Sequence, residues 1–336
     1  MSEQFSGHEL EAGLLQRARS WRDIFPPLVM LQSLRVTGSP IYVSLWLITL
    51  IVISLVLPER TSDSVATGWN RIDEIWPLAL GDRAVNFEWP EAGRLVACLL
   101  IAMVPIAATQ RAGALYAAGR DGESLFSGLV LIKQRVWGLL LVLVLPSVCI
   151  VGLAVPIALL AALSYVPAVG DTLVRWLAIL VAPFAILIGL VGAGSMIAIP
   201  LGWASIAIEK REDAFDALSR GYEYLYRRPV HTFLYLVISF LVATLLGWIA
   251  QWVAYVGAWI SARVMTLVAR ESLPPVMRMV FEHLPAAVAM TSLFALLGAV
   301  YLVLRQDANQ QEIEDIAVSV IDRRKSSLPT LRDAKA

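Results

Sequence analysis

Three histidines and one acidic pair are the residues of this chain that could support acid–base catalysis or metal binding. His8, His231 and His283 lie far apart, and none has a second ligand at the short spacing that a zinc site uses. Glu212 and Asp213 are adjacent, but no residues around them complete an active-site constellation. The sequence also lacks a Gly-x-Ser-x-Gly elbow and a phosphate-binding loop. We therefore predict no catalytic residue, no cofactor site and no metal site, and we expect that the protein is not an enzyme.

Five basic residues could instead contact lipid headgroups, because they lie next to or between long uncharged stretches. They are Arg111, Arg220, Arg227, Arg228 and His231. Arg111 follows Thr109 and Gln110, whose polar side chains could share a phosphate oxygen with it. An alternative for Arg111 is that its long side chain extends to the nearest headgroups without binding a particular one.

Long uncharged stretches dominate the 336-residue chain, in which 58% of residues are apolar and 16% are charged. A soluble domain has about 45–50% apolar and about 25% charged residues, and a helix needs about 20 apolar residues to cross a bilayer. Six charge-free windows are candidate spans: residues 36–58, 95–110, 136–170, 176–208, 232–262 and 284–304. The third to fifth windows exceed the bilayer thickness, so we expect those helices to tilt, to kink or to extend beyond the lipid.

Basic residues are distributed unequally between the two sides of these windows. With the N-terminus inside, the inner segments hold 19 Lys and Arg residues and the outer segments hold 8. Inner segments of membrane proteins are enriched in Lys and Arg. The distribution predicts a multi-pass membrane protein with both termini in the cytoplasm.

The predicted fold is all-α, a polytopic membrane bundle of six transmembrane helices with amphipathic helices on the cytoplasmic side. Residues 1–39 form a cytoplasmic segment, residues 40–306 the six-span domain, and residues 307–336 a partly disordered cytoplasmic tail. The N-terminal segment has an apolar helical face, which either lies in the membrane interface or packs on the protein's own loops. The outer loop 59–93 carries three tryptophans that either anchor it at the headgroups or cover a cavity.

Small residues recur at every fourth position near the end of the fourth window, at Gly194, Ala198 and Gly202. Such a row lets two helix backbones approach closely within a membrane. The spacing predicts a helix-packing seam, whose partner is either another helix of the chain or a second copy.

An amphipathic helix is expected over residues 210–226, between the fourth and fifth windows. Its apolar stripe consists of Phe215, Leu218, Tyr222 and Leu225. Acid-before-base pairs four residues apart, Asp216–Arg220 and Glu223–Arg227, should stabilise it. Both ends join spans directly, so we predict that the helix lies flat at the inner membrane face, with the stripe toward lipid or the span ends. In the alternative, the stripe packs wholly on the protein's own helices.

One short motif in this region resembles a known group of proteins. An acidic pair, Ala-Leu and Arg-Ser follow one another in that group, and here the residues are Glu212-Asp213, Ala217-Leu218 and Arg220-Gly221. The chain resembles uncharacterised six-helix bacterial (planctomycete-type) integral membrane proteins and, more distantly, the membrane domain of glycerophosphodiester phosphodiesterases. The resemblance implies six spans and location in the inner (plasma) membrane of a bacterium. The catalytic domain of the phosphodiesterases has no counterpart in this chain, so their activity is not implied.

These patterns favour a non-catalytic membrane component: a scaffold, an assembly partner or a lipid-associated accessory protein. The alternative is a transporter or channel for a lipid-like or uncharged solute, with the kinked third and fourth spans as its walls. The uncharged centres of the windows give no support for coupled transport, which uses ionisable residues at membrane depth. The expected partners are membrane lipids and other membrane proteins. Basic and acidic residues are equal in number, at 27 each, which gives no reason to expect nucleic acid. The sequence specifies no oligomeric state.

Overall fold

Every regular element that the structure describes is a helix. The structure is a computed structural model that describes residues 27–56, 89–120, 125–163, 165, 170–209, 213–268 and 273–309. The elements in these ranges are α3 (Pro27–Gln32), η1 (Ser33–Val36), α4 (Pro40–Val56), α7 (Trp89–Ala117), α8 (Leu125–Gln134), α9 (Val136–Leu163), α10 (Gly170–Ile208), α11 (Ala214–Arg227), α12 (Pro229–Val268) and α13 (Pro275–Asn309). The all-α prediction is confirmed for these residues. The predicted N-terminal amphipathic helix, most of the outer loop 59–93 and most of the tail lie outside them.

Five of the described helices are long and apolar enough to cross a membrane. The spans are Val96–Ala117, Val136–Leu163, Val174–Ile208, Pro229–Val268 and Pro275–Ala308. A sixth span is present only if Leu28–Val36 and Pro40–Val56, which meet at a bend of 72°, count as one. By length and composition the chain is therefore a multi-pass membrane protein, whereas the sixth span and the orientation stay predictions.

Proline residues begin four of these helices. They are Pro27, Pro40, Pro229 and Pro275. A proline suits the first helical position, because its fixed φ is already helical and its missing N–H would have no partner there. α11 begins differently: the Asp213 carboxylate accepts a hydrogen bond from the Ala214 N–H at 2.8 Å and caps the helix. At the other end of α11, only Arg228 separates it from α12, so no loop lies between these two helices.

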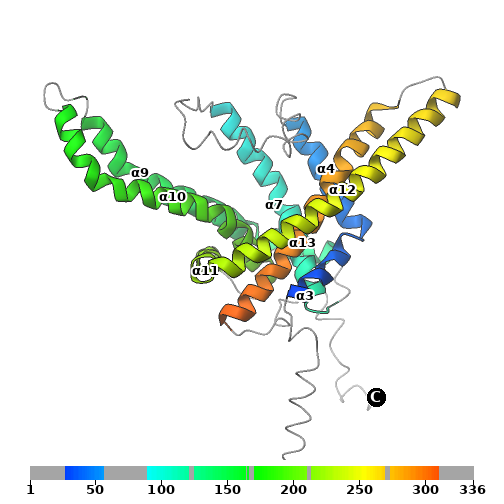
Figure 1. The fold of residues 1–336 in the computed structure, drawn as a ribbon, viewed down its shortest axis with the longest axis horizontal. Coiled ribbons are helices and arrows are strands. Elements are labelled where there is room, and N and C mark those ends of the chain that lie inside the picture. The colour runs from blue at the N-terminus through cyan, green and yellow to red at the C-terminus, as the bar shows by residue number, and fades with distance from the viewer. Residues whose placement is uncertain are drawn as a thin grey trace, which may run out of the picture.

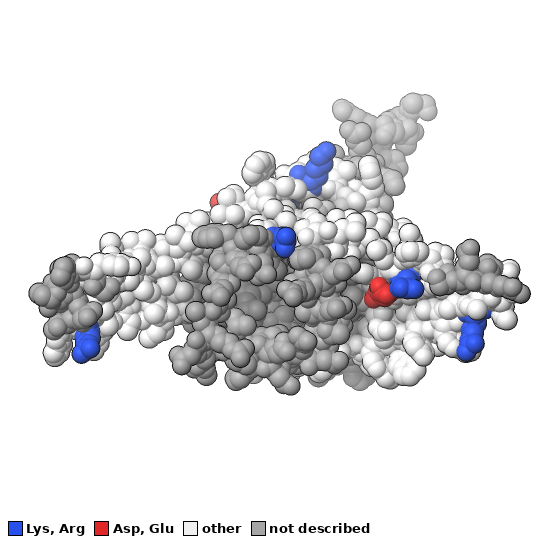
Figure 2. Space-filling model, turned by 90° about the horizontal axis from the view of Figure 1, so that it is seen from above, with Lys and Arg blue, Asp and Glu red and all other residues white. Residues whose placement is uncertain are grey.

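The long helices form two arms that diverge from a common base (Figure 1). One arm is the pair α9–α10 and the other is the pair α12–α13, while α4 and α7 lie between the arms and α3 and α11 lie near the base. α10 has 39 residues and α12 has 40, so each is about 60 Å long, against a hydrocarbon thickness of about 30 Å. Because both helices run obliquely, the height that each one spans is smaller than its length. Seen from above, the arms extend to opposite sides and carry few charged residues along their length (Figure 2).

The core lies where α7 and α13 cross between the arms. A Cβ on Gly113 would overlap the Ala295 carbonyl, and a Cβ on Gly298 would overlap the Gln110 carbonyl, so the two backbones are in direct contact. Small residues permit such contact in a membrane, where packing rather than water drives helix association. The crossing fixes α7 and α13 relative to each other, and with them the arginines that these helices carry at the base.

A row of aromatic side chains follows α12 away from the base. Its members, Trp248, Trp252, Tyr255 and Trp259, are all exposed. The Trp248 and Trp252 rings lie 6.0 Å apart, and the guanidinium of Arg263 lies 5.7 Å from the centroid of the Trp259 ring. Trp and Tyr favour the boundary between hydrocarbon and water. The row therefore marks the part of this arm that suits a membrane interface.

Candidate functional site

The C-terminal end of α10 is the point on which the base converges. The last carbonyls of a helix have no partner within it and need donors from elsewhere. The Arg111 guanidinium, on α7, donates to the Ala207 carbonyl at 2.7 Å. Arg135, between α8 and α9, donates to the carbonyls of Ile206 and Glu209. Positive charge also suits the negative end of the helix dipole, so two arginines distant in sequence cap α10.

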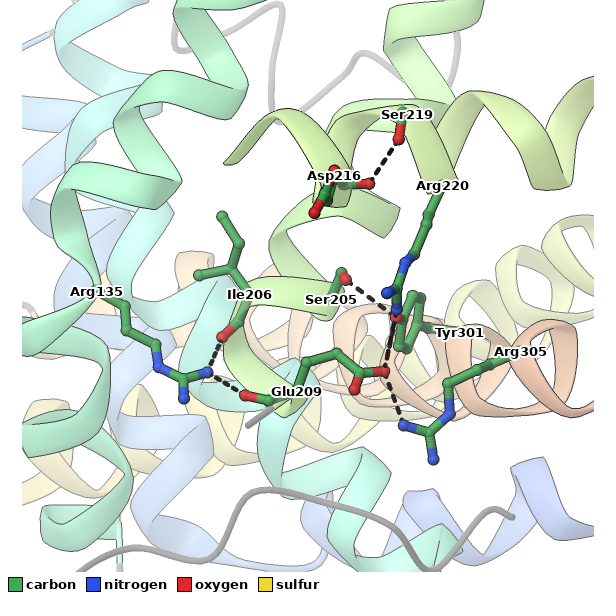
Figure 3. A network of polar contacts seen from close by, with 9 residues as sticks. All are labelled: Arg135, Ser205, Ile206, Glu209, Asp216, Ser219, Arg220, Tyr301 and Arg305. Atoms are coloured by element: carbon green, nitrogen blue, oxygen red, sulfur yellow. Dashed lines mark hydrogen bonds and ion pairs between the residues drawn. The ribbon is translucent and has the colours of Figure 1, made fainter. Parts of the chain in front are cut away.

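The Glu209 carboxylate joins three helices at the same point (Figure 3). Arg305 on α13 donates to it at 2.7 Å, Tyr301 one turn earlier donates at 3.0 Å, and the Arg220 guanidinium on α11 lies 3.7 Å away. Hydrogen bonds with an ionised partner are roughly twice as strong as neutral ones. We call Glu209, Arg220, Tyr301 and Arg305 the Glu209 joint, because they tie the end of α10 to α11 and α13.

The Glu209 joint is largely shielded from solvent. The side chain of Arg305 is 1% exposed and that of Glu209 is 14% exposed. A buried ion pair is costly to break, because removing one partner leaves the other charge uncompensated. No group of three His, Cys, Asp or Glu side chains that could hold a metal occurs in the described part of the chain. The arrangement of the joint is suited to holding helices together.

Tyr224 lies beside the Glu209 joint, with its ring centroid 6.0 Å from that of Tyr301. It is 1% exposed, and its hydroxyl has no hydrogen-bond partner among the described residues. Burial raises the pKa of Tyr224 to about 12, although the nearby charge of Arg220 opposes this rise. The hydroxyl is therefore neutral at physiological pH and adds no charge to the joint.

Two of the five predicted headgroup contacts are turned into the protein. Arg111 is 1% exposed, so neither interpretation made of it from the sequence holds. Its guanidinium binds a peptide carbonyl of α10 in place of a phosphate, because α7 continues past the predicted end of the second window and packs at the base. Arg220 points toward Glu209 (Figure 3).

The other three predicted contacts lie at the surface, where α11 meets α12. Arg227, Arg228 and His231 are all exposed. Arg227 donates to Glu223 at 2.6 Å, which is one of the two pairs expected within this helix, and Arg228 lies 3.4 Å from Asp307 of α13. These three basic side chains are exposed, and their contact with headgroups stays a prediction.

The seam on α10 faces α11 of the same chain. The facing residues are Gly194 with Tyr222, Ala198 with Gly221, and Gly202 with Ala217. A Cβ added to Gly221 would lie 2.6 Å from the Ala198 carbonyl oxygen. Residue numbers rise along α11 as they fall along α10, so the two helices run antiparallel at this contact. The close approach explains the small residues at these positions.

The buried face of α11 differs from the predicted apolar stripe. It consists of Ala214, Ala217, Leu218, Gly221 and Tyr224. Of the stripe, Leu218 is buried and Tyr222 and Leu225 are half-buried, whereas Phe215 is 66% exposed. The alternative in which the stripe packs wholly on the protein's own helices therefore does not hold for Phe215, whereas contact of Phe215 with lipid stays a prediction. Contact with the α10 seam selects small residues, so the buried face is offset from the line of large ones.

An apolar groove of about 320 Å³ lies between α10, α12 and α13. It is lined by Met196, Ile197, Pro200, Leu236, Val237, Phe240, Leu241, Leu293 and Leu297. Along α10 and α13, the lining residues nearest to the Glu209 joint lie one to three turns from it. The groove brings together three helices that the sequence separates, so periodicity within any one window could not reveal it.

Comparison with known proteins adds no assignment to this geometry. No protein-family model, curated protein or solved structure matches the chain. Sequence reasoning also missed Glu209, Arg135 and Arg305 as a set, since each was only the charged residue that borders an apolar window. A usable signal was present, because Glu209 and Arg305 carry opposite charges at the same end of two windows.

Proposed function

We propose that this protein is a non-catalytic, lipid-associated scaffold of a bacterial inner membrane, with the base on the cytoplasmic side. The observation that carries the proposal is the Glu209 joint, which ties α10, α11 and α13 together by directed contacts to one carboxylate. Such a base holds the arms in a defined relation to each other, which is what a platform for other membrane components requires.

The exposed arms supply the surface that a scaffold needs. In α10 only 6% of the most apolar window is buried, against 72% in α13. The arm formed by α9 and α10 therefore offers apolar surface to lipids or to other membrane proteins. The resemblance of residues 212–221 to six-helix bacterial membrane proteins supports the same topology, and we propose that relationship without an activity.

Transport of a lipid-like or uncharged solute is the second candidate, and the apolar groove favours it. Transport would require the groove to open to both sides of the membrane in turn, and therefore the joint at the base to rearrange. The buried Arg305–Glu209 contact opposes such a rearrangement. We therefore rank the scaffold first.

The two candidates are separated by extraction in native lipid followed by identification of the copurifying proteins. A scaffold should recover the same membrane proteins in repeated preparations. Replacing Ile179 and Ile186, which are exposed on α10, with alanine should weaken that recovery if this arm is the platform. Recovery of the chain alone, together with solute flux in proteoliposomes, would instead establish transport.

A further inference from the structure

The groove between α10, α12 and α13 has the chemistry of a lipid-tail site. All of its lining side chains are apolar, so none can hydrogen-bond a polar solute. Its volume of about 320 Å³ lies at the lower end of the range of roughly 300–1,000 Å³ found for ligand pockets. A ligand that fits must be apolar and slender.

The depth of the groove matches the tail region of the leaflet on the base side. Leu236 follows Pro229, the first residue of α12, by about 10 Å along the helix axis. The exposed Arg227 and Arg228 just before α12 suit the headgroup level, and the headgroup layer is only about 5–8 Å thick. The groove therefore begins where acyl chains replace headgroups.

A helix from a second copy of the chain does not fit this groove. With its side chains a helix is about 10–12 Å across, so it could cover this groove and place single side chains in it, but it could not lie inside it. An acyl chain is only one methylene wide and can lie along the lining residues. Of these two apolar occupants, only the acyl chain can therefore lie within the groove along its length.

We infer that the groove binds one acyl chain of a phospholipid from the leaflet on the base side. The glycerol and headgroup of that lipid point toward the corner of α11 and α12, where Arg227 and His231 are exposed. This site rests on the proposed lipid-associated role and names its ligand class. A lipid held here would pack between the two arms and support the angle between them.

Native mass spectrometry of the full chain, extracted in mild detergent, tests the site with a matched pair of variants. Val237 lines the groove, whereas Val253 is 63% exposed on the same helix and does not line it. The wild type and Val253→Trp should each retain a phospholipid, and Val237→Trp, whose added bulk fills the groove, should lose it. Equal retention by both variants, or no retained phospholipid in the wild type, would overturn the site, as would a retained quinone or free fatty acid.

A second measurement on the wild type keeps the test decisive if Val237→Trp does not fold. The protein is placed in vesicles of phosphatidylethanolamine and phosphatidylglycerol that contain a phospholipid with a photoreactive tail. Crosslinks should concentrate at Met196, Leu236 and Phe240, and an even spread over the exposed arms would overturn the site. If the crosslinks do not concentrate at the groove but protein partners are still recovered, the lipid site is overturned and the scaffold role is not. If a phospholipid is retained but no partners are recovered, the scaffold role is overturned and the lipid site is not.

Discussion

Arg305 and Glu209 lie 96 residues apart in the sequence, and Nη1 of Arg305 donates to the Glu209 carboxylate at 2.7 Å with the arginine almost completely buried. The contact joins the last turn of α10 to α13, so one helix from each arm ends at the same charge. Because the aligned carbonyls at the end of α10 carry partial negative charge, the cations of the base also stabilise the helix itself. The pair therefore has two structural effects.

Glu209→Gln should destabilise the protein by about 3 kcal/mol, because it removes the anion nearest to a buried guanidinium. The measurement is unfolding in detergent, followed by circular dichroism. The matched control is Glu223→Gln, which breaks the Glu223–Arg227 pair, whose side chains are 36% and 67% exposed. That change should cost about 0.5 kcal/mol or less. Equal losses in the two variants would show that the joint contributes no more than a surface pair.

Gly221→Ala should destabilise the contact between α10 and α11 by about 1–3 kcal/mol, because the new Cβ would lie too close to the Ala198 carbonyl. Gly152→Ala is the control, since a Cβ at Gly152 on α9 meets nothing within 4 Å. That substitution should be neutral or stabilising by about 0.5–1 kcal/mol, because alanine is the better helix former. Differential scanning fluorimetry of both variants measures the difference. A stable Gly221→Ala variant would mean that the seam is looser than the structure has it.

Tyr224 should make the protein sensitive to high pH. Its pKa is about 12 in the folded chain against an ordinary value of 10, so the unfolded chain releases the proton first as pH rises. Stability from this group is therefore complete below about pH 10 and is lost as pH rises toward about 12. Unfolding temperatures measured across this interval should fall less steeply in Tyr224→Phe than in the wild type. Tyr165→Phe, at an 88% exposed position, should follow the wild type; matching slopes in all three proteins would contradict the assignment.

The base should lie on the cytoplasmic side if the distribution of basic residues sets the orientation. Reporter fusions at residues 120, 215 and 330 should then give cytoplasmic signals, and fusions after residues 75 and 272 should give external ones. The fusion after residue 75 also tests the sixth span, which depends on the bent pair at the N-terminal end. A cytoplasmic signal at that position would reduce the number of spans.

The long apolar helices could be predicted because a membrane imposes a simple local rule on the chain. Charge-free runs such as 136–170 and 232–262 exceed the length of a span, and the structure places helices of spanning length there. The partner of Arg111 could not be predicted in this way. Arg111 reads as the end of a window, yet its partner is a carbonyl 96 residues away, which no local pattern reveals.

Of the candidate site, only the row of small residues on α10 could be predicted from the sequence. Spacing alone identified Gly194, Ala198 and Gly202 as small residues suited to close packing. The face of α11 that packs there was missed, because hydrophobic patterning favours large side chains such as Phe215 over Ala217 and Gly221. Hydrophobic patterning identifies the side chains that are removed from water. Contact between two helix backbones in a membrane depends instead on side chains that are small.

The divergence of the arms also affects how the surrounding lipids pack. A body that is narrow at the base and broad at the arm tips displaces more area from one leaflet than from the other (Figure 1). Lipids on the tip side must then spread around a wider obstacle, so the lateral pressure in the two leaflets is no longer balanced. A bilayer relieves that imbalance by bending. Membrane that is convex toward the arm tips should therefore be the preferred location of this protein.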